Sequence, residues 1–542
     1  MSLKTIKCLT LASFFLFLCL GLFLSDDYGM SCDEPIQRNH GLVSAKYIAS
    51  IISLDAFSKK FEKIPALENY VHKNYGVIFH LPVVFVEIGT GMAEPELWHF
   101  RHAYTFLWFF IAVIFFYLLV SRRYGREIAL LACLFFILSP RIFAESFYNV
   151  KDLACLSAFT VAMYFCVRYL EKKSFGAALC LALSSAVASN IRITGILLPA
   201  LVCLFFMFDY VRNRSFNKKE WGSIIFLLVL TPILTIALWP AAWANPIRFL
   251  WETMVLSSNY TRWDNTIIYL GEVTRGAALP WHYIPVWFAI TTPLSYLLLF
   301  VMGLFVMMQN LSKTKGVLLK IEANKEDLFY LAIVVIPVAL VILFRSTLYG
   351  GWRHLYFIYP AFLLIVINGL TWLMSKARSV IAKNPAWKNA AACLLFGALV
   401  IYSVYIAYWM VRNHPYQYVY FNFLAGNDIA NTFDRDYWGV AARAGLEYVT
   451  KTDQRKQIKV SGSSIIHLEN NMKLLQQSDG KRILLVPPVD AEYFIETYRN
   501  VRGSSTMETT GREMYSVVID SFKIMSVFDL TGRRKNEGRI YP

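Results

Sequence analysis

The sequence predicts a mostly α-helical polytopic membrane protein with about 11 transmembrane helices and a small external α/β domain at its C-terminal end. The 542 residues are 57% hydrophobic and only 17% charged, whereas soluble globular proteins are about 45–50% apolar and about 25% charged. Apolar runs near the bilayer-spanning length of about 20 residues recur up to residue 411. These observations exclude a water-soluble enzyme, a disordered chain and a disulfide scaffold.

Eleven apolar runs are candidate spans. They cover roughly residues 7–24, 103–121, 127–140, 152–170, 175–191, 193–210, 222–242, 283–308, 328–344, 354–374 and 389–411. The first run has the length of a signal peptide, but Ser25-Asp26-Asp27 follows it without an A-x-A-like cleavage site. We therefore expect an uncleaved anchor.

The distribution of Lys and Arg predicts the orientation. With the N-terminus inside, the cytoplasmic segments of residues 1–411 hold 20 basic and 7 acidic residues, and the remainder holds 15 of each. The C-terminus is then outside, and the external loops are 25–102, 140–151, 243–282 and 345–353. The net charge of +16 therefore faces anionic lipid, and no nucleic-acid partner is expected.

Residues 1–411 are predicted to form the transmembrane domain, and residues 412–542 differ from them in composition. Of these last 131 residues, 33 are charged and none belongs to a membrane-length apolar run. Short apolar runs occur at 457–460, 482–486, 491–498, 515–519 and 522–528. The last two flank Asp520-Ser521, which predicts a β-hairpin. We expect a small external α/β domain.

The first external loop contains adjacent acids, Asp33 and Glu34, followed by Pro35. Proline is favoured in the first turn of a helix and keeps the preceding residue extended. Asp33 then lies just before a helix N-terminus. There it could act as a general base, as a metal ligand, or as favourable charge on the helix dipole.

The second external loop has a high density of polar residues. Arg141, Glu145 and Asn149 would share one face of a helix, and Lys151 and Asp152 follow. The loop is either a solvated turn with an Arg–Glu pair or a polar wall opposite Asp33. A divalent metal shared by Asp33 and Glu145 is compatible with the sequence, which does not require one.

Two more segments place cations near the external surface. Arg192 stands between two apolar runs, where it either faces a polar cavity or snorkels to lipid headgroups. Arg353 and His354 close a turn that contains Tyr349 and two glycines. Arginine presents a fork of donors that matches phosphate oxygens. His282, beside two aromatic residues, contacts substrate or belongs to an interfacial aromatic belt.

At these residues the sequence resembles the GT-C superfamily of membrane glycosyltransferases. The nearest group is family 39, with the dolichyl-phosphate-mannose protein mannosyltransferases and the bacterial lipid A aminoarabinose transferases. The resembling segments are Asp33-Glu34-Pro35, residues 140–152, the Arg192 segment, residues 279–285, residues 350–354 and residues 414–422. They follow family order across residues 26–430, and the lack of room for a β-trefoil insert favours a bacterial member.

The resemblance implies an inverting glycosyltransferase with a polyprenyl-phosphate sugar donor and a glycan, lipid or protein acceptor on the extracytoplasmic face. Asp33 would be the general base with support from Glu34, and Glu145 would help shape the acceptor side of the catalytic site. The donor phosphate would be held by Arg192, Arg353, Lys151, Arg141 and His354. Other pocket residues would be Asn149, Asp152, Tyr349 and His282. A bacterial inner (plasma) membrane location is implied.

Two other classes of function remain open. One is a transporter or flippase of lipid-linked sugars, and the other is a non-catalytic scaffold that binds polyprenyl lipid. Transporters often show inverted repeats and charges at mid-membrane. This sequence shows no internal repeat, and its notable ions cluster near one surface, which favours an enzyme.

Overall fold

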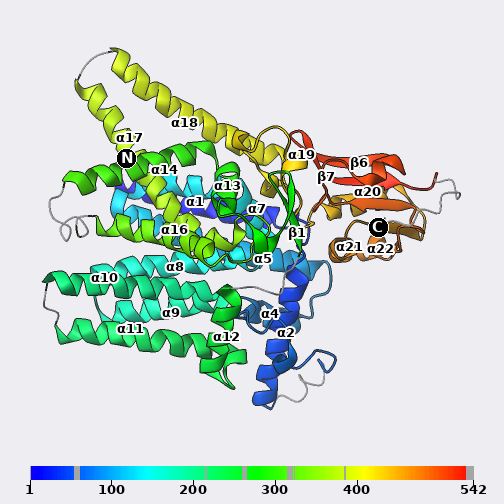
Figure 1. Cartoon of the computed structure of the whole chain (residues 1–542), viewed down its shortest axis with the longest axis horizontal. Coiled ribbons are helices and arrows are strands. Elements are labelled where there is room, and N and C mark those ends of the chain that lie inside the picture. Colours follow the sequence, from blue (N-terminus) through cyan, green and yellow to red (C-terminus); the bar gives the residue numbers. More distant parts are fainter. Residues whose placement is uncertain are drawn as a thin grey trace.

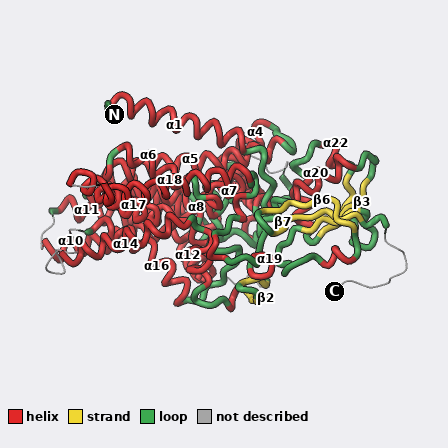
Figure 2. Tube along the Cα trace, turned by 90° about the horizontal axis from the view of Figure 1, so that it is seen from above, coloured by secondary structure: helices red, strands yellow, loops and turns green. Residues whose placement is uncertain are grey.

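The computed structural model describes residues 2–53, 61–213, 217–258, 265–313, 322, 324–383 and 386–532. Helices form a long bundle, and a five-stranded sheet lies at one end of it (Figure 1). The first helix, α1 (Leu3–Leu24), runs along the bundle from the far end towards the sheet (Figure 2). The predicted fold class, a mostly helical membrane protein with a small β-containing unit near its C-terminal end, is confirmed.

Eight helical segments in the described part of the chain are long and apolar enough to cross a membrane. They are α1, α5 (Glu96–Tyr124), α8 (Asp152–Glu171), η2–α10 (Ile193–Ile196 and Leu197–Asn213), α11 (Lys218–Ala237), α14 (Leu294–Lys313), α16 (Lys325–Leu343) and η5–α17 (Arg353–Ile358 and Tyr359–Lys383). A bent pair, α6 (Arg126–Ile137) and α7 (Pro140–Tyr148), would make a ninth.

One of the eleven predicted spans, α9 (Phe175–Ile191), is a shorter apolar helix of 17 residues. The last predicted span corresponds to α18 (Ala386–Arg412), a helix of 27 residues. The number of spans and their orientation therefore stay predictions.

Proline interrupts two of the predicted spans. The single run expected over 283–308 is two helices, α13 (Tyr283–Thr291) and α14, because Thr292 precedes Pro293 and is extended (φ −101°, ψ 138°). Ser139 is likewise extended before Pro140, and α7 bends away from α6 by 71°. Helix α7 packs against η6 (Gln417–Val419), which follows the last apolar helix.

The two long predicted external loops contain short elements. The first holds α2 (Glu34–Ile51), η1 (Leu67–Asn69) and α4 (His80–Thr90). The short helix η3 (Pro240–Ala242) precedes the second loop, which holds α12 (Pro246–Ser258), strands β1 (Thr266–Tyr269) and β2 (Glu272–Arg275), and η4 (Gly276–Ala278). The hairpin of β1 and β2 turns through Leu270 and Gly271, both with positive φ, which is the geometry of a tight hairpin turn.

The sheet has the order β4-β3-β5-β7-β6. Its strands are β3 (Ile458–Gly462), β4 (Ile483–Leu485), β5 (Tyr493–Glu496), β6 (Arg512–Ile519) and β7 (Phe522–Asp529). β3 is parallel to β4 and β5, and β7 is antiparallel to β5 and β6. The antiparallel pair β6–β7 is the hairpin expected around Asp520-Ser521. Short helices α20 (Ala442–Thr452), α21 (Ile465–Met472) and α22 (Gln477–Gly480) complete the unit.

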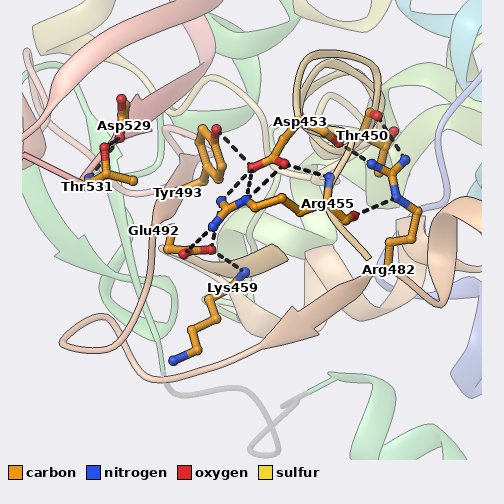
Figure 3. A network of polar contacts seen from close by, with 9 residues as sticks. All are labelled: Thr450, Asp453, Arg455, Lys459, Arg482, Glu492, Tyr493, Asp529 and Thr531. Carbon is orange, nitrogen blue, oxygen red and sulfur yellow. Dashed lines mark hydrogen bonds and ion pairs between the residues drawn. The ribbon is translucent and has the colours of Figure 1, made fainter. Parts of the chain in front are cut away.

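A polar network stabilises one margin of this C-terminal unit. Arg455 pairs with Asp453 (2.6 Å) and with Glu492 (2.7 Å), and the Glu492 carboxylate also accepts the backbone N–H of Lys459 (Figure 3). The network joins the end of α20 to the strands β3 and β5. Arg455 is therefore a surface arginine whose charge is paired with two carboxylates.

The first loop is clamped against the C-terminal unit. The backbone N–H of Met30 donates to Asn471 Oδ1 (2.9 Å), and that of Cys32 donates to the carbonyl of Trp438 (3.3 Å). A Cβ on Gly29 would lie 2.1 Å from the carbonyl oxygen of Val440, so only glycine fits there. These contacts fix the segment that leads into Asp33.

Candidate functional site

Asp33 stands at the N-cap of α2, but its side chain makes no capping hydrogen bond. Its Oδ2 lies 2.9 Å from Lys151 Nζ and 3.8 Å from Arg353 Nη1. The carboxylate is therefore turned towards two cations from distant parts of the chain. The structure gives no support to a role in capping the helix, and the placement agrees with a functional role.

Asp152, at the first turn of α8, joins the next two cations. Arg353 Nη1 donates to its Oδ2 (2.6 Å), and Arg192 Nη2 donates to its Oδ1. Asn149 holds this carboxylate in place, because its Oδ1 accepts the backbone N–H of Asp152 (2.9 Å) and its Nδ2 donates to Oδ2 (3.2 Å). A carboxylate that is only 1% exposed is thus fully paired.

Aromatic rings surround the guanidinium of Arg353. Its central carbon lies 4.8 Å from the ring centre of Tyr349, 4.9 Å from that of Tyr437 and 4.8 Å from that of Trp438. Nη2 also donates to Tyr437 Oη (3.0 Å). Such packing holds a buried arginine in one orientation.

The turn before Arg353 depends on Gly350 and Gly351, which have φ of 66° and 73°. A Cβ on Gly350 would lie 2.9 Å from Arg353 Nε. The glycines therefore allow the backbone to pass close to the arginine.

Glu145 lies beside this cluster on α7. Its Oε1 accepts from Tyr356 Oη (2.7 Å) and its Oε2 accepts from Asn149 Nδ2 (2.7 Å). The predicted polar wall therefore exists as a buried hydrogen-bonded chain from Tyr356 through Glu145 and Asn149 to Asp152.

Three predicted site residues point elsewhere. Glu34 accepts from the backbone N–H of Ser31 (2.7 Å) and pairs with His102 (2.9 Å), so it braces the loop. Arg141 donates to the carbonyl of Tyr420 (3.2 Å) and packs on the rings of Trp287 and Phe421. His282 Nδ1 lies 2.6 Å from Tyr269 Oη on β1. The structure thus gives each of these three residues partners outside the Asp33 cluster.

A cavity of about 140 Å³ opens beside the cluster. Its polar lining includes Tyr75, Arg192, Thr347, Tyr349 and His354. Apolar side chains, among them Ile193, Val341 and Leu355, complete the wall. The cavity therefore offers cationic and hydrogen-bonding groups next to apolar surface, which suits a small anionic group attached to an apolar chain.

The charges of the cluster do not balance. Three cations, Lys151, Arg192 and Arg353, surround two carboxylates, Asp33 and Asp152. Burial raises the pKa of Asp33, but Lys151 and Arg353 outweigh burial and hold that pKa below its usual value. Burial lowers the pKa of Lys151, and Asp33 raises it to a net value above the ordinary one. At neutral pH the cluster keeps a positive surplus, which attracts an anion.

The sequence is compatible with a metal ion shared by Asp33 and Glu145 but does not require one. Within the described residues no group of three or more His, Cys, Asp or Glu side chains is placed to hold a metal ion. Asp33 faces Lys151, and Glu145 faces Tyr356 and Asn149. The two carboxylates thus have other partners, and a metal shared between them stays without structural support.

Sequence reasoning missed the residues that the C-terminal unit contributes. Tyr437 and Trp438 contact Arg353, and Arg499 packs on Tyr437 at 4.5 Å. The available signal was the dense charged and aromatic run of residues 434–438. Nothing local in the sequence places residue 499 near residue 353.

Comparison with known proteins found one matching family and several similar solved structures. A family profile described as dolichyl-phosphate-mannose-protein mannosyltransferase matches residues 84–239. The crystal structure of ArnT from Cupriavidus metallidurans in the apo state shares 13% identity, with a TM-score of 0.48, over 96% of this chain and 98% of that chain. The structure of the same protein bound to undecaprenyl phosphate shares 12% identity, with a TM-score of 0.47 and the same coverage. No curated protein matches the chain.

The segment matched by the family profile contains Glu145, Asn149, Lys151, Asp152 and Arg192. It also contains helices long and apolar enough to cross a membrane. The match confirms the resemblance to the dolichyl-phosphate-mannose-protein mannosyltransferases over this segment, and the apolar helices support an integral, multi-pass membrane protein.

Proposed function

We propose that this protein is an inverting glycosyltransferase that moves a sugar from a polyprenyl-phosphate donor to an acceptor on the extracytoplasmic face of the bacterial inner membrane. The observation that carries the proposal is the position of Asp33. Its carboxylate lies 2.9 Å from Lys151 and 3.8 Å from Arg353, next to the cavity that Arg192 lines. A proton acceptor thus stands beside an anion-binding group of cations.

The cations would hold the donor phosphate. Arg353 and Arg192 are bridged by Asp152, so their guanidinium groups are fixed before any ligand arrives. Fixed arginine forks form strong, charge-assisted hydrogen bonds with phosphate oxygens. The apolar part of the cavity wall, from Ile193 and Val341, would accept the first units of the lipid chain.

Asp33 would act as the general base. The acceptor oxygen or nitrogen attacks the anomeric carbon, the bond between that carbon and the phosphate oxygen breaks, and polyprenyl phosphate leaves with the electron pair. Asp33 takes the proton of the acceptor. The single displacement inverts the anomeric centre, and hydroxyl or amine acceptors on a glycan, a lipid or a protein all meet its chemical requirement.

Donor binding and base strength would be linked. The pKa of Asp33 is held low by Lys151 and Arg353 against the effect of burial, and a carboxylate with a low pKa is a weak base. A donor phosphate that draws both cations towards its own oxygens weakens their hold on Asp33. The base would therefore gain strength only when the donor is in place.

The proposal is tested by mass spectrometry of cell-envelope glycans and lipids with and without the gene. One sugar missing from one acceptor would support it and name both substrates. The purified protein, reconstituted with that donor and acceptor, should then form product. Movement of the lipid-linked sugar across the bilayer without product would instead indicate a flippase, and donor binding with neither would indicate a scaffold.

A further inference from the structure

Arg499 is held in a constrained turn of the C-terminal unit, just after β5. Its neighbours Tyr498 and Asn500 have positive φ values of 40° and 58°, which non-glycine residues rarely adopt. Arg435 stabilises this turn by donating to the carbonyls of Val501 (2.6 Å) and Gly503 (2.9 Å). A costly backbone conformation that the surrounding structure maintains often has a functional reason.

The side chain of Arg499 reaches the site through Tyr437. Its guanidinium carbon lies 4.5 Å from the centre of the Tyr437 ring, and that of Arg353 lies 4.9 Å from the same centre. The two positive charges are therefore closer than about 10 Å, the screening length of 0.1 M salt. Two like charges at this separation repel each other, and an anion that lies near both offsets the repulsion by attracting each of them.

Arg499 has no carboxylate partner of its own among the described residues, where no Asp or Glu oxygen lies within 4.0 Å of its nitrogens. Its hydrogen-bond partner is His467 Nε2, at 3.4 Å. Burial lowers the pKa of His467 to about 3, so this ring is neutral and gives Arg499 no negative partner, and the carboxyl groups of Asp434 and Asp436 act on Arg499 only from beyond ion-pair distance. By contrast, Arg353 and Arg192 share Asp152, and Lys151 pairs with Asp33.

We propose that Arg499 binds the phosphate of the lipid carrier together with Arg353, so that the C-terminal unit completes the donor site. This inference rests on the proposed function. With Arg499 the group contains four cations, Lys151, Arg192, Arg353 and Arg499, and the carboxylates in ion-pair contact with them are Asp33 and Asp152. The surplus of two positive charges matches a phosphate monoester, which carries about −1.5 to −2 near pH 7.

The surplus of two positive charges matches the charge of the departing polyprenyl phosphate better than the charge of the intact donor. A polyprenyl-phosphate sugar is a phosphodiester with a single negative charge, and the second charge develops as the bond to the sugar breaks. A cation placed for that second charge stabilises the transition state more than the bound donor. Arg499 would therefore affect the maximal rate and the affinity for polyprenyl phosphate more than the affinity for the intact donor.

The experiment measures binding of undecaprenyl phosphate and of undecaprenol to the full-length protein in detergent. Arg499→Gln should weaken undecaprenyl phosphate binding about 10- to 100-fold, the range expected when a charge-assisted hydrogen bond is lost, and leave undecaprenol binding unchanged. Arg499→Lys should weaken it less. Arg455→Gln is the matched control, since Arg455 also belongs to the C-terminal unit but pairs with Asp453 and Glu492 (Figure 3).

Wild-type affinity for undecaprenyl phosphate in Arg499→Gln would overturn the inference, as would an equal loss of undecaprenol binding. If Arg499→Gln does not fold, Arg499→Lys decides: an affinity for undecaprenyl phosphate reduced about 5-fold or more supports the inference, and an unchanged one refutes it. The measurement needs no sugar transfer. A wild-type protein that binds undecaprenyl phosphate but forms no product would count against the proposed function alone.

Discussion

Asp33→Asn separates the chemical role of this carboxylate from its structural role. The change keeps the size of the side chain and removes its charge and its ability to accept a proton. Transfer should fall about 10²- to 10⁴-fold, the usual contribution of a general base. Helix α2 should persist, because the Asp33 side chain makes no capping hydrogen bond.

The structure also sets the size of the effects on stability and donor binding. The variant loses the ion pair with Lys151, whose side chain is 11% exposed against 15% for Asp33. A loss of about 1–3 kcal/mol in the free energy of unfolding is expected for one largely buried charged contact. The cluster gains one positive charge, so donor phosphate should bind as well as in the wild type or more tightly.

The assay measures turnover and donor affinity separately, with thermal unfolding in detergent as the check on folding. Asp27→Asn is the matched control, since Asp27 lies in the same loop, is 47% exposed and pairs with His414. It should behave as the wild type. Turnover at the wild-type rate in Asp33→Asn would remove Asp33 from the mechanism, and a loss of donor affinity equal to the loss of turnover would assign it to binding.

Three further predictions follow from single contacts. Lys151→Gln removes the main cation that opposes burial at Asp33, so the acid limb of the pH–rate profile should move to higher pH; an unmoved limb would mean that Asp33 is not the base. Gly29→Ala places a Cβ 2.1 Å from a backbone carbonyl and should lower both the unfolding temperature and transfer, whereas Gly89→Ala, with open space around its Cβ, should lower neither. His467 has a pKa of about 3 in the folded protein because of burial, against about 6.5 when unfolded. Only the unfolded chain binds its proton between these values, so the contribution of His467 is fully present above about pH 6.5 and falls by about 1.4 kcal/mol per pH unit towards pH 3; unfolding measured from pH 4 to pH 7 should show a smaller slope in His467→Gln, and an equal slope would contradict the assignment.

The candidate site shows how far local sequence patterns reach. Asp33, Lys151, Asp152 and Arg353 could be singled out because charged residues at the ends of apolar runs are costly and usually functional. Their partners could not be assigned. Lys151 could have paired with Glu145 on its own loop, but in the structure Glu145 accepts a hydrogen bond from Tyr356 and Lys151 pairs with Asp33.

The sequence by itself determined the helical membrane class, the position of nearly every apolar helix and the β-hairpin near its C-terminal end. Hydrophobic length and side-chain period are properties of a short stretch of chain, so they can be read without its neighbours. Only the tertiary structure decided which acid pairs with which cation. It paired Glu34 with His102 and packed the Tyr437 ring against both Arg353 and Arg499. These contacts join residues that are 40 or more positions apart in the sequence, and the physical reason is that their separation in space is set by packing of the whole bundle against the C-terminal sheet.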